Sequence, residues 1–588
     1  MRTRRTTTLV LAATLALGLG GLASCEGSEG SPDGEYDEAF PTGKADSPYS
    51  ECELDQVVAY LNDASVTAGT LRAGGVHSRA ADNLIAYRNG PDGAAGTSDD
   101  NLFESIEEVD AVPWVGPTAM AQLVAIVKGL CGEAPSISVI FSPQPYESSH
   151  LVRVAQLIDG AERSLDIAMY SMSDSGILSA LERAVGRGVS VRMIFEPARE
   201  DQRSPAGTYS AKLEEKGVDV RYINKIMHHK FVIVDGPRES IDQAAGATLV
   251  TGSGNWSNGA GTKYDENTAF IKGSAELILL FQQEFNLLWE NSREFTAGRT
   301  FEFTTSMPVT PDMIVDEPSL GVVFTSANFS TSTTSYGPTF SSVTGRNTVS
   351  DKLVELINAA TQSIHIASGH LRSRPVAEAL LAKAAANPGM DIRIYLDGQE
   401  YISQSYNDEQ LRTLETCLQA AGSSESAIQD CNDNGFYFSY QAQAAGIPLR
   451  FKTYCYRWDA RYALQMHHKT FIFDGKILAS GSYNLSDNAE HETMENMVIY
   501  DGSVFPDLVA AFEQNFAAMW DTGRREGLYE QLLYTAQETA DPIPIVFAPM
   551  ALDWSQVTEL KSAIRQACPA VDSQAYRDDP VGHQTCYR

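Results

Sequence analysis

The sequence has few cationic residues, no long apolar run beyond its first residues and no closely spaced cysteine pair. Lys and Arg number 44 against 76 Asp and Glu, so the formal net charge is −32 at neutral pH. Such a charge repels nucleic acids and anionic lipid surfaces on average, and no Lys- or Arg-rich run follows residue 5. No later segment has 18 or more apolar residues in a row, so no transmembrane helix is expected. The eight cysteines include no Cys-x-x-Cys, so a zinc site has no support. We also expect no cofactor.

The first 50 residues predict an exported chain. Residues 1–24 begin with three arginines and continue with an apolar run over 9–19, which is too short to span a membrane and is typical of an export signal. The segment 22–25 resembles a bacterial lipoprotein cleavage site, which implies that Cys25 carries a lipid anchor; an ordinary cleavage site with a chance cysteine is the alternative. Residues 25–50 are acidic and rich in Gly, Ser and Pro, so they predict a flexible tether. We therefore expect a protein anchored in a bacterial cell envelope or secreted.

Residues 51–132 predict a small helical domain. Its second part reads as helix, tight hairpin over 113–117, and helix, which resembles a helix-hairpin-helix module. In that family the hairpin backbone binds a nucleic-acid phosphate, but Pro113 and Pro117 remove two N–H donors here and only Lys128 supplies a nearby cation. A structural or protein-contact role is therefore favoured over DNA binding.

An acidic loop in the same domain and the cysteines leave further alternatives open. Asp92, Asp99 and Asp100 could bind calcium, although the loop over 92–100 lacks the ligand spacing of an EF-hand. Export would bring the chain into an oxidising compartment, where disulfides form, and cysteines close in sequence are the simplest pairs. The predicted pairs are Cys52–Cys131, Cys417–Cys431 and Cys568–Cys586, with Cys455 left over.

A pattern of polar residues occurs twice in the rest of the chain. The second copy spans 467–484 as H-x-K-x4-D-x6-G-S-x-N, and the first spans 228–255; each is followed by Glu-Asn, with the Glu 11 residues after the last Asn. Between the Asp and the Gly the first copy has 16 residues and the second has 6, which indicates a duplicated unit with a loop insertion around 236–247. The candidate site residues are His228, Lys230, Asp235, Ser253, Asn255 and Glu266 in the first copy, and His467, Lys469, Asp474, Ser482, Asn484 and Glu495 in the second.

These residue types suit chemistry on a phosphate group. His can act as a nucleophile or as an acid and base near neutral pH, Lys binds a phosphate oxygen, and Ser and Asn add neutral donors. On an extended strand the His and Lys of H-x-K point to one face. Two copies facing each other would place a His on each side of the phosphorus, and the downstream Glu could hold each imidazole in one tautomer. The alternative interpretation is two core histidines on buried strands.

The two motifs resemble those of the phospholipase D superfamily, over residues 136–530. The resemblance implies a metal-free displacement in two steps through a phosphohistidine, with His228 as the nucleophile and His467 as the acid and then the base. It also implies that Ser253, Ser482 and the Lys and Asn residues of both motifs bind the phosphate. Asp235 and Asp474 belong to the catalytic motif, but they lie one strand length past the His and are expected to be structural.

The expected fold is α/β. The chain is long enough for two to four domains, and its strands and helices alternate. We predict two sandwich domains of α/β/α layers over 136–300 and 320–530, related by a pseudo-twofold axis, with each motif at a sheet edge facing the other. Segment 399–447 is an insertion that could shape the substrate entrance, and the extension over 531–588 is expected to pack on the second half without chemistry.

The leading function is hydrolysis of phosphatidylcholine-like lipids to phosphatidic acid and a free head group, by a monomer that meets the membrane as substrate and through its lipid anchor. A nuclease of the same superfamily is the alternative, which the hairpin module favours and the charge disfavours. Phosphatidyl transfer is also compatible with the motifs. A non-catalytic envelope lipoprotein is the interpretation from another class, and it would require damaged motifs.

Overall fold

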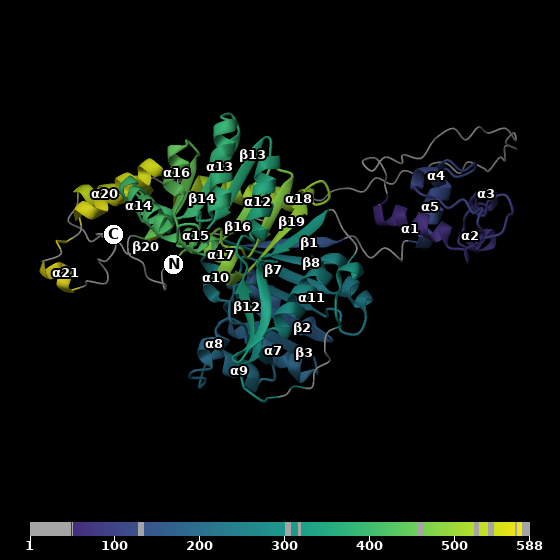
Figure 1. Cartoon of the computed structure of the whole chain (residues 1–588), viewed down its shortest axis with the longest axis horizontal. Helices are drawn as coiled ribbons and strands as arrows, with labels where there is room; N and C mark the ends of the chain where they lie inside the picture. Colours follow the sequence, from purple (N-terminus) through teal and green to yellow (C-terminus); the bar gives the residue numbers. More distant parts are fainter. Residues whose placement is uncertain are drawn as a thin grey trace, which may run out of the picture. The chain divides into compact units, whose positions relative to one another are not determined.

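The protein is described from a computed structural model, in which the chain forms two compact units, Met1–Gly132 and Glu133–Arg588 (Figure 1). Each unit is described by itself. The described residues are 49, 51–127, 135–299, 301, 307–314, 319–455, 464–522, 528–538, 546–567, 569–570 and 573–578. None of the helices in these ranges is long and apolar enough to cross a membrane.

The first unit is helical, as predicted. Its helices are α1 (Glu51–Asn62), α2 (Ala68–Ala73), α3 (Ser78–Arg88), α4 (Ile106–Asp110) and α5 (Pro117–Val127). They close around one apolar cluster that includes the fully buried Leu61, Leu84 and Leu123. The turn between α4 and α5 places Trp114 at a φ of 74°, and the Arg79 guanidinium covers the indole at 4.3 Å. In the described residues no group of three or more His, Cys, Asp or Glu side chains could hold a metal ion, so calcium binding at the acidic loop gains no support.

The second unit contains two eight-stranded mixed sheets. In the first sheet β2, β3 and β4 are parallel neighbours and all other neighbours are antiparallel. The spatial order is β1 (Ser136–Ser142), β8 (Glu266–Lys272), β7 (Thr248–Gly252), β6 (Lys230–Val234), β2 (Ser164–Met169), β3 (Ser190–Phe195), β4 (Asp219–Tyr222) and β9 (Arg293–Glu294).

The second sheet repeats this order position by position. Its order is β10 (Leu320–Phe324), β19 (Asn496–Asp501), β17 (Ile477–Gly481), β16 (Lys469–Phe473), β13 (Ser363–Ser368), β14 (Asp391–Asp397), β15 (Leu449–Cys455) and β20 (Val546–Asp553). The match confirms the predicted α/β fold with two related halves. It also shows that the C-terminal extension takes part in the second sheet, because β20 pairs with β15 in the place that β9 has in the first.

Side chains alternate between the two faces of each sheet, and this alternation builds the layers. Phe231 and Ile233 of β6 point into one apolar cluster and Val232 and Val234 into another. The outer clusters contain α6 (His150–Gly160) and α7 (Ser175–Gly186) in the first half, and α12 (Thr348–Ala359) and α13 (Arg374–Ala386) in the second.

One inner cluster joins the two halves. It contains side chains from both sheets and from α11 (Ala275–Glu290) and α18 (Pro506–Asp521). Full burial of a side chain such as Phe281 contributes about 1.5–3 kcal/mol to folding. The two halves therefore share a core and form one folded body.

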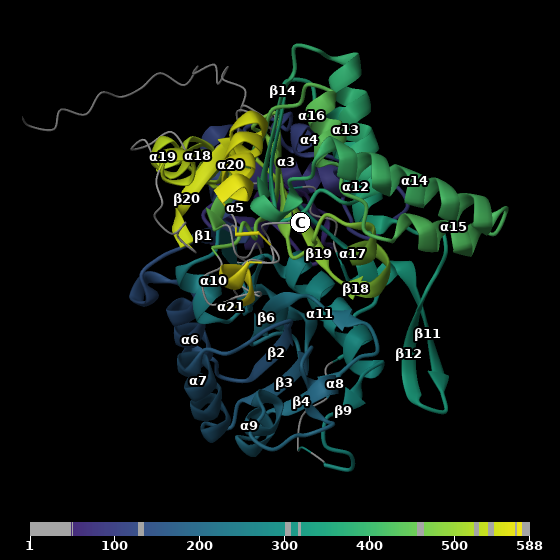
Figure 2. The ribbon, with the colours of Figure 1, turned by 90° about the vertical axis from the view of Figure 1, so that its left-hand side faces the viewer.

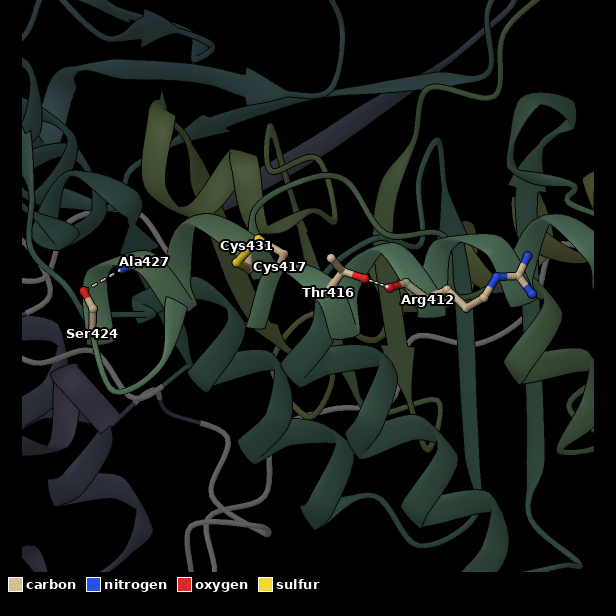
Figure 3. The surroundings of a disulfide bond; sticks show 6 residues. All are labelled: Arg412, Thr416, Cys417, Ser424, Ala427 and Cys431. Atoms are coloured by element: carbon tan, nitrogen blue, oxygen red, sulfur yellow. Dashed lines mark hydrogen bonds between the residues drawn. A yellow bond between two sulfur atoms is a disulfide. The ribbon is translucent and has the colours of Figure 1, made fainter. Parts of the chain in front are cut away.

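The insertion over 399–447 is helical and carries the disulfide between Cys417 and Cys431, which confirms one predicted pair (Figure 3). It contains η5 (Gly398–Glu400), α14 (Gln404–Ala421), α15 (Glu425–Asn432) and α16 (Ser439–Ala444), and α14 lies beside α15 (Figure 2). Cys25, Cys131, Cys568, Cys586 and the side chains of Cys52 and Cys455 lie outside the described residues.

The remaining elements lie at the surface of this frame or connect it. A polar hairpin of β11 (Phe329–Thr334) and β12 (Gly337–Ser342) extends from the second half (Figure 2). The other helices are α8 (Ala198–Asp201), α9 (Tyr209–Glu215), α10 (Asn258–Thr262), α17 (Asp487–Glu492), α19 (Leu528–Glu538), α20 (Trp554–Ala567) and α21 (Gln574–Asp578). The insertion in the first motif contains a short 3-10 helix, Ile241–Gly246.

Candidate active site

The two motifs lie at the ends of central strands. His228 precedes β6 and His467 precedes β16, and each of these strands is the fourth of eight in its sheet. The prediction that the motifs occupy a sheet edge is therefore wrong. Its cause is that β7, β8, β17 and β19 went unrecognised in the sequence, and these strands extend each sheet beyond the motif strand.

The backbone before each motif His pairs with the other half of the chain. β5 (Ile226–Met227) runs parallel to β18 (Thr493–Met494), and the His228 N–H donates to the carbonyl of the last β18 residue at 3.1 Å. The mirrored contact is present in the other copy, where the His467 N–H donates to the Asp265 carbonyl at 2.9 Å. These bonds fix both histidines at the junction between the halves.

The carboxylates cross between the halves in the same way. His228 Nδ1 lies 2.8 Å from a carboxylate oxygen of Glu495, and His467 Nδ1 lies 2.8 Å from Glu266 Oε1. Both carboxylates are fully buried. When the carboxylate is ionised, the imidazole carries its proton at Nδ1 and keeps the Nε2 lone pair free for attack on phosphorus or for taking a proton. Each copy of the motif thus supplies the imidazole for one site and the carboxylate for the other.

The lysines are buried beside the same imidazoles. Lys230 Nζ donates to the His228 carbonyl at 2.6 Å, and Lys469 Nζ donates to the His467 carbonyl at 2.7 Å. On the first side, the Tyr170 ring lies 4.5 Å from the His228 ring and 4.8 Å from Lys230 Nζ. A buried ammonium group of this kind keeps further N–H donors for an anionic oxygen.

The Asn residues of the G-S-x-N segments face the imidazole cluster. Asn484 Nδ2 lies 3.5 Å from His228 Nε2, and the Asn255 N–H donates to Glu266 Oε2 at 3.1 Å. The side-chain oxygen of Asn255 is buried and has no hydrogen-bond partner among the described residues. The Asn484 amide therefore lies where it can contact an oxygen of a bound phosphate, and the Asn255 backbone holds the carboxylate that lies at His467.

The serines of the same segments have other partners. Ser253 Oγ accepts the Asn267 N–H at 3.0 Å, and Ser482 Oγ accepts the Asn496 N–H at 3.0 Å. Both hydroxyls therefore hold the Glu-Asn segments, and the phosphate contact expected of them from the sequence stays a prediction.

Asp235 and Asp474 lie at the far ends of β6 and β16, away from the imidazoles. Their φ angles are 54° and 55°, in the left-handed region that Asp tolerates better than most residues. Each carboxylate accepts three consecutive backbone N–H groups, from 162–164 and from 361–363. These contacts hold the start of the neighbouring central strand, which is the structural role expected from their spacing.

Two further pairs were missed in the sequence. The second His of each His-His-Lys contacts the Asn of the other half: His229 Nδ1 lies 2.9 Å from Asn496 Nδ2, and His468 Nδ1 lies 3.0 Å from Asn267 Nδ2. The His-His and Glu-Asn pairs recur in both copies of the motif, and this repetition is the signal in the sequence that could have identified these contacts.

Two acidic residues also hold the chain before each motif. Glu196 Oε2 accepts the Met227 N–H at 2.6 Å, and Asp397 Oδ2 accepts the Met466 N–H at 2.9 Å. They follow β3 and end β14, and no motif marks them in the sequence.

Burial sets the protonation of the cluster. It lowers the pKa of both His228 and His467 well below the usual value, and Lys230 and Lys469 add to this effect. Burial also lowers the pKa of Lys469 to about 8, and it raises the pKa of Glu266 to about 8 and that of Glu495 to about 7. The neutral imidazole is therefore the favoured form on both sides, and an anion between them would raise the pKa of both rings.

Comparison with known proteins agrees with this geometry. Residues 154–289 and 353–520, more than half of the chain, match the family model described as cardiolipin synthase, PLD-like domain. The chain belongs to this phospholipase D-like family. Both halves of this phospholipase D-like protein are covered by the match, and each matched segment contains one motif from His to Glu-Asn.

Relatives of the phospholipase D-like chain match it over a quarter of its length. The mitochondrial cardiolipin hydrolase of Xenopus tropicalis is 31% identical over 150 residues, which are 25% of this chain and 65% of the relative. The Chlamydomonas reinhardtii protein of the same name is 32% identical over 153 residues, 25% of this chain and 62% of the relative. The match thus spans less than two thirds of either relative.

Two solved structures are also similar. Nuc, a phospholipase D family member from Salmonella typhimurium, is 30% identical, with 27% of this chain and 98% of that chain covered and a TM-score of 0.23. The phosphatidylserine synthase of Haemophilus influenzae Rd KW20 is 13% identical, with 67% of this chain and 90% of that chain covered and a TM-score of 0.40.

Proposed function

We propose that the protein is a phosphodiesterase of the phospholipase D type that hydrolyses phospholipids to phosphatidic acid and a free head group. The observation that carries the proposal is the crossed arrangement of two buried imidazoles, each with Nδ1 at 2.8 Å from a carboxylate of the other half. Two lysines and two Asn amides surround them. This set supplies a nucleophile, an acid and donors for the charge that develops on phosphoryl oxygens.

The proposed reaction has two displacements at phosphorus. His228 Nε2 attacks, a P–N bond forms, and the P–O bond to the leaving alcohol breaks while the protonated His467 gives its proton to that oxygen. His467 then takes a proton from water, whose oxygen attacks the phosphorus, and the P–N bond breaks. Both halves carry equivalent groups, so the choice of His228 as nucleophile follows the precedent of the family. The ammonium groups of Lys230 and Lys469 and the amides of Asn255 and Asn484 bind the non-bridging oxygens.

Phospholipid is the substrate class that the remaining observations favour. The net charge of −32 opposes the approach of a nucleic acid, whose backbone charge dominates its binding to proteins. The similar relatives named cardiolipin hydrolase point to the same class. One chain contains both motifs, so a monomer suffices for the site. Export and a lipid anchor at Cys25 would hold it beside its substrate, and they are proposed from the sequence alone.

The test compares lipid and nucleic-acid substrates on the purified chain. Phosphatidylcholine and phosphatidylglycerol vesicles and single-stranded DNA are incubated separately, and phosphatidic acid and DNA fragments are measured. We expect phosphatidic acid from at least one lipid, and none from the His228→Ala protein. Cleavage of DNA with no lipid product would replace the proposal by a nuclease, and transfer to added glycerol would identify a phosphatidyl transferase.

A further inference from the structure

A polar pocket of about 400 Å³, lined by residues of the second half, opens beside the imidazole cluster. Asn484 belongs to its wall, and the amide of that residue lies 3.5 Å from His228 Nε2. The pocket therefore adjoins the phosphate position. Its His370 also lies near enough to His467, the proposed acid for the leaving alcohol, to contribute to the lowered pKa of that ring, so the pocket can hold the leaving head group. The residues that line it are His370, Arg372, Asp433, Asn434, Gly435, Asn484, Ser486, Asn488, Ala489 and Thr493.

The matched positions of the first half differ in chemistry. Both the Ser173 N–H in the first half and the Arg372 N–H in the second donate to the carbonyl of the residue after G-S-x-N, so these positions correspond. By the same register Ser171 corresponds to His370. The first half thus has two small hydroxyls where the second half has an imidazole and a guanidinium. The catalytic residues, by contrast, are of the same types in both halves. A structural requirement that both halves share therefore does not explain the difference at positions 370 and 372.

A buried carboxylate fixes these two side chains. Glu400 Oε1 accepts Arg372 Nε at 2.9 Å and lies 3.0 Å from His370 Nδ1, while Glu400 Oε2 accepts the Leu371 N–H at 3.1 Å. Glu400 is 0% exposed, and the Arg372 guanidinium lies 4.2 Å from the Tyr437 ring. Because Glu400 is charged and paired, the Arg372 side chain keeps its place while its remaining N–H groups face the pocket.

The opposite wall comes from the insertion. Residues 433–435 follow Cys431, whose disulfide to Cys417 ties α15 to α14. Both carboxylate oxygens of Asp433 lie 3.0 Å from His491 Nδ1. Burial lowers the pKa of His491, but the hydrogen bond to Asp433 outweighs this and raises it, which favours the charged imidazole. The Arg372 guanidinium and the Asp433 carboxylate thus each have a partner of opposite sign, Glu400 and His491.

We infer that this pocket binds a hydroxylated head group, such as glycerol or inositol, and selects against choline. The inference rests on the proposed phosphodiesterase function. Neighbouring amides, a hydroxyl, a carboxylate and a guanidinium offer both donors and acceptors, which a polyol needs and a quaternary ammonium group cannot use. Choline is bound over the faces of Trp, Tyr and Phe rings, and none of the described residues that line the pocket is a Trp, Tyr or Phe. A second phosphate would require a net positive pocket, which these paired charges do not provide.

The test uses dihexanoyl phosphatidylglycerol and dihexanoyl phosphatidylcholine as dissolved monomers, so that membrane surface charge plays no part. Bis(4-nitrophenyl) phosphate, which has no head group, reports the catalytic cluster by itself. We expect kcat/KM for phosphatidylglycerol to exceed that for phosphatidylcholine by about 10²-fold or more, because a site built to bind hydroxyl groups discriminates strongly against analogues without them. Equal turnover of the two lipids, or cleavage of single-stranded DNA in place of both, would overturn the inference. If the wild-type protein hydrolyses neither lipid and also fails to hydrolyse bis(4-nitrophenyl) phosphate, the result counts instead against the proposed function.

Variants of the pocket residues test whether the pocket causes the preference for phosphatidylglycerol over phosphatidylcholine. Asn434→Ala and Asn488→Ala remove exposed amides of the pocket, and each should lower the phosphatidylglycerol to phosphatidylcholine ratio at least fivefold, mainly through KM. Arg372→Ser with Glu400→Gln gives position 372 the residue of the first half without leaving a buried charge unpaired, and it should abolish the preference. Arg393→Ser is the matched control, because Arg393 forms a surface ion pair with its near neighbour in β14. A ratio unchanged in both Asn variants would show that the pocket does not hold the head group.

Discussion

Glu495 of the second half lies 2.8 Å from the Nδ1 atom of His228, which belongs to the first half. The mirrored pair, Glu266 with His467, has the same distance. A carboxylate that orients an imidazole acts on the step that this imidazole performs. A substitution of the Glu in one half should therefore slow the step that the His of the other half performs.

The carboxylate variants should separate the two steps. Glu495→Gln should slow formation of the phosphohistidine by about 10²–10⁴-fold, because it removes the carboxylate that orients His228, the proposed nucleophile. Glu266→Gln should slow its hydrolysis by a similar factor, so that with a nitrophenyl ester the adduct on His228 accumulates. Rapid quench and mass spectrometry of acid-labile phosphopeptides measure both.

Histidine variants under the same quench assign the nucleophile. His467→Ala should trap the adduct on His228, whereas His228→Ala should leave nothing to trap. An adduct on His467 in the His228→Ala protein would reverse the assigned roles.

Binding of a phosphate-like anion should take up protons. Burial and the two lysines lower the pKa of His228 and His467, and an anion between the rings raises both values, so the liganded site binds more protons than the free site. The affinity for inorganic tungstate should therefore rise as pH falls from 8 to 6, by at most about tenfold per pH unit for each proton. Calorimetry in two buffers of different ionisation enthalpy measures the uptake. Heats that are independent of the buffer would contradict the prediction.

Asp474→Asn should reduce stability and leave the chemistry intact at low temperature. The backbone N–H groups of residues 361–363 overcome the effect of burial and lower the pKa of Asp474 to about 2. The folded-state pKa is below the unfolded one, so this stabilisation is complete above about pH 4 and is lost as the pH falls toward 2. Loss of the charged acceptor should cost about 1.5–3 kcal/mol at pH 7, read from urea unfolding. If Asp474→Asn lowered the free energy of unfolding by the same amount at pH 2.5 as at pH 7, the result would contradict this pH dependence.

Removal of the disulfide should act mainly on the pocket. Cys417 and Cys431 are 14 residues apart, and closing a loop of that length is worth about 3 kcal/mol by chain entropy. The Cys417→Ser and Cys431→Ser double variant should melt earlier and lose part of its head-group preference, because residues 433–435 follow the bond directly. Differential scanning calorimetry and the substrate ratio measure the two effects. An unchanged ratio alongside a lowered melting temperature would limit the bond to a stabilising role.

The mature chain should begin at a lipidated Cys25. The short apolar run and the segment 22–25 carry this prediction, which concerns residues outside those that the structure describes. Intact-mass analysis of the membrane fraction of a bacterial host should find a diacylated N-terminus, and a Cys25→Ala chain should leave that fraction. An unmodified wild-type chain in the medium would rule the anchor out.

The sequence was sufficient to predict the motifs and the α/β fold, because five polar positions recur at matching spacings and the motif strands are unbroken apolar runs. It was not sufficient for β7, whose short Thr248–Gly252 run ends in a motif glycine and resembles a loop. The crossed pairing is a contact between residues about 200 or more positions apart, such as Glu266 and His467, and local pattern contains no information on it. Glu400 was missed for the same reason, since its role is defined by Arg372 of another element.

The crossed carboxylates also bear on how the chain is made. A ribosome completes the first motif early, yet His228 lacks its orienting group until residue 495 of 588 has been added. Nascent chains and fragments cut before that point contain an intact first motif without the groups that make it a catalyst. A chain that ends before residue 495 therefore has the first motif but only part of the catalytic cluster.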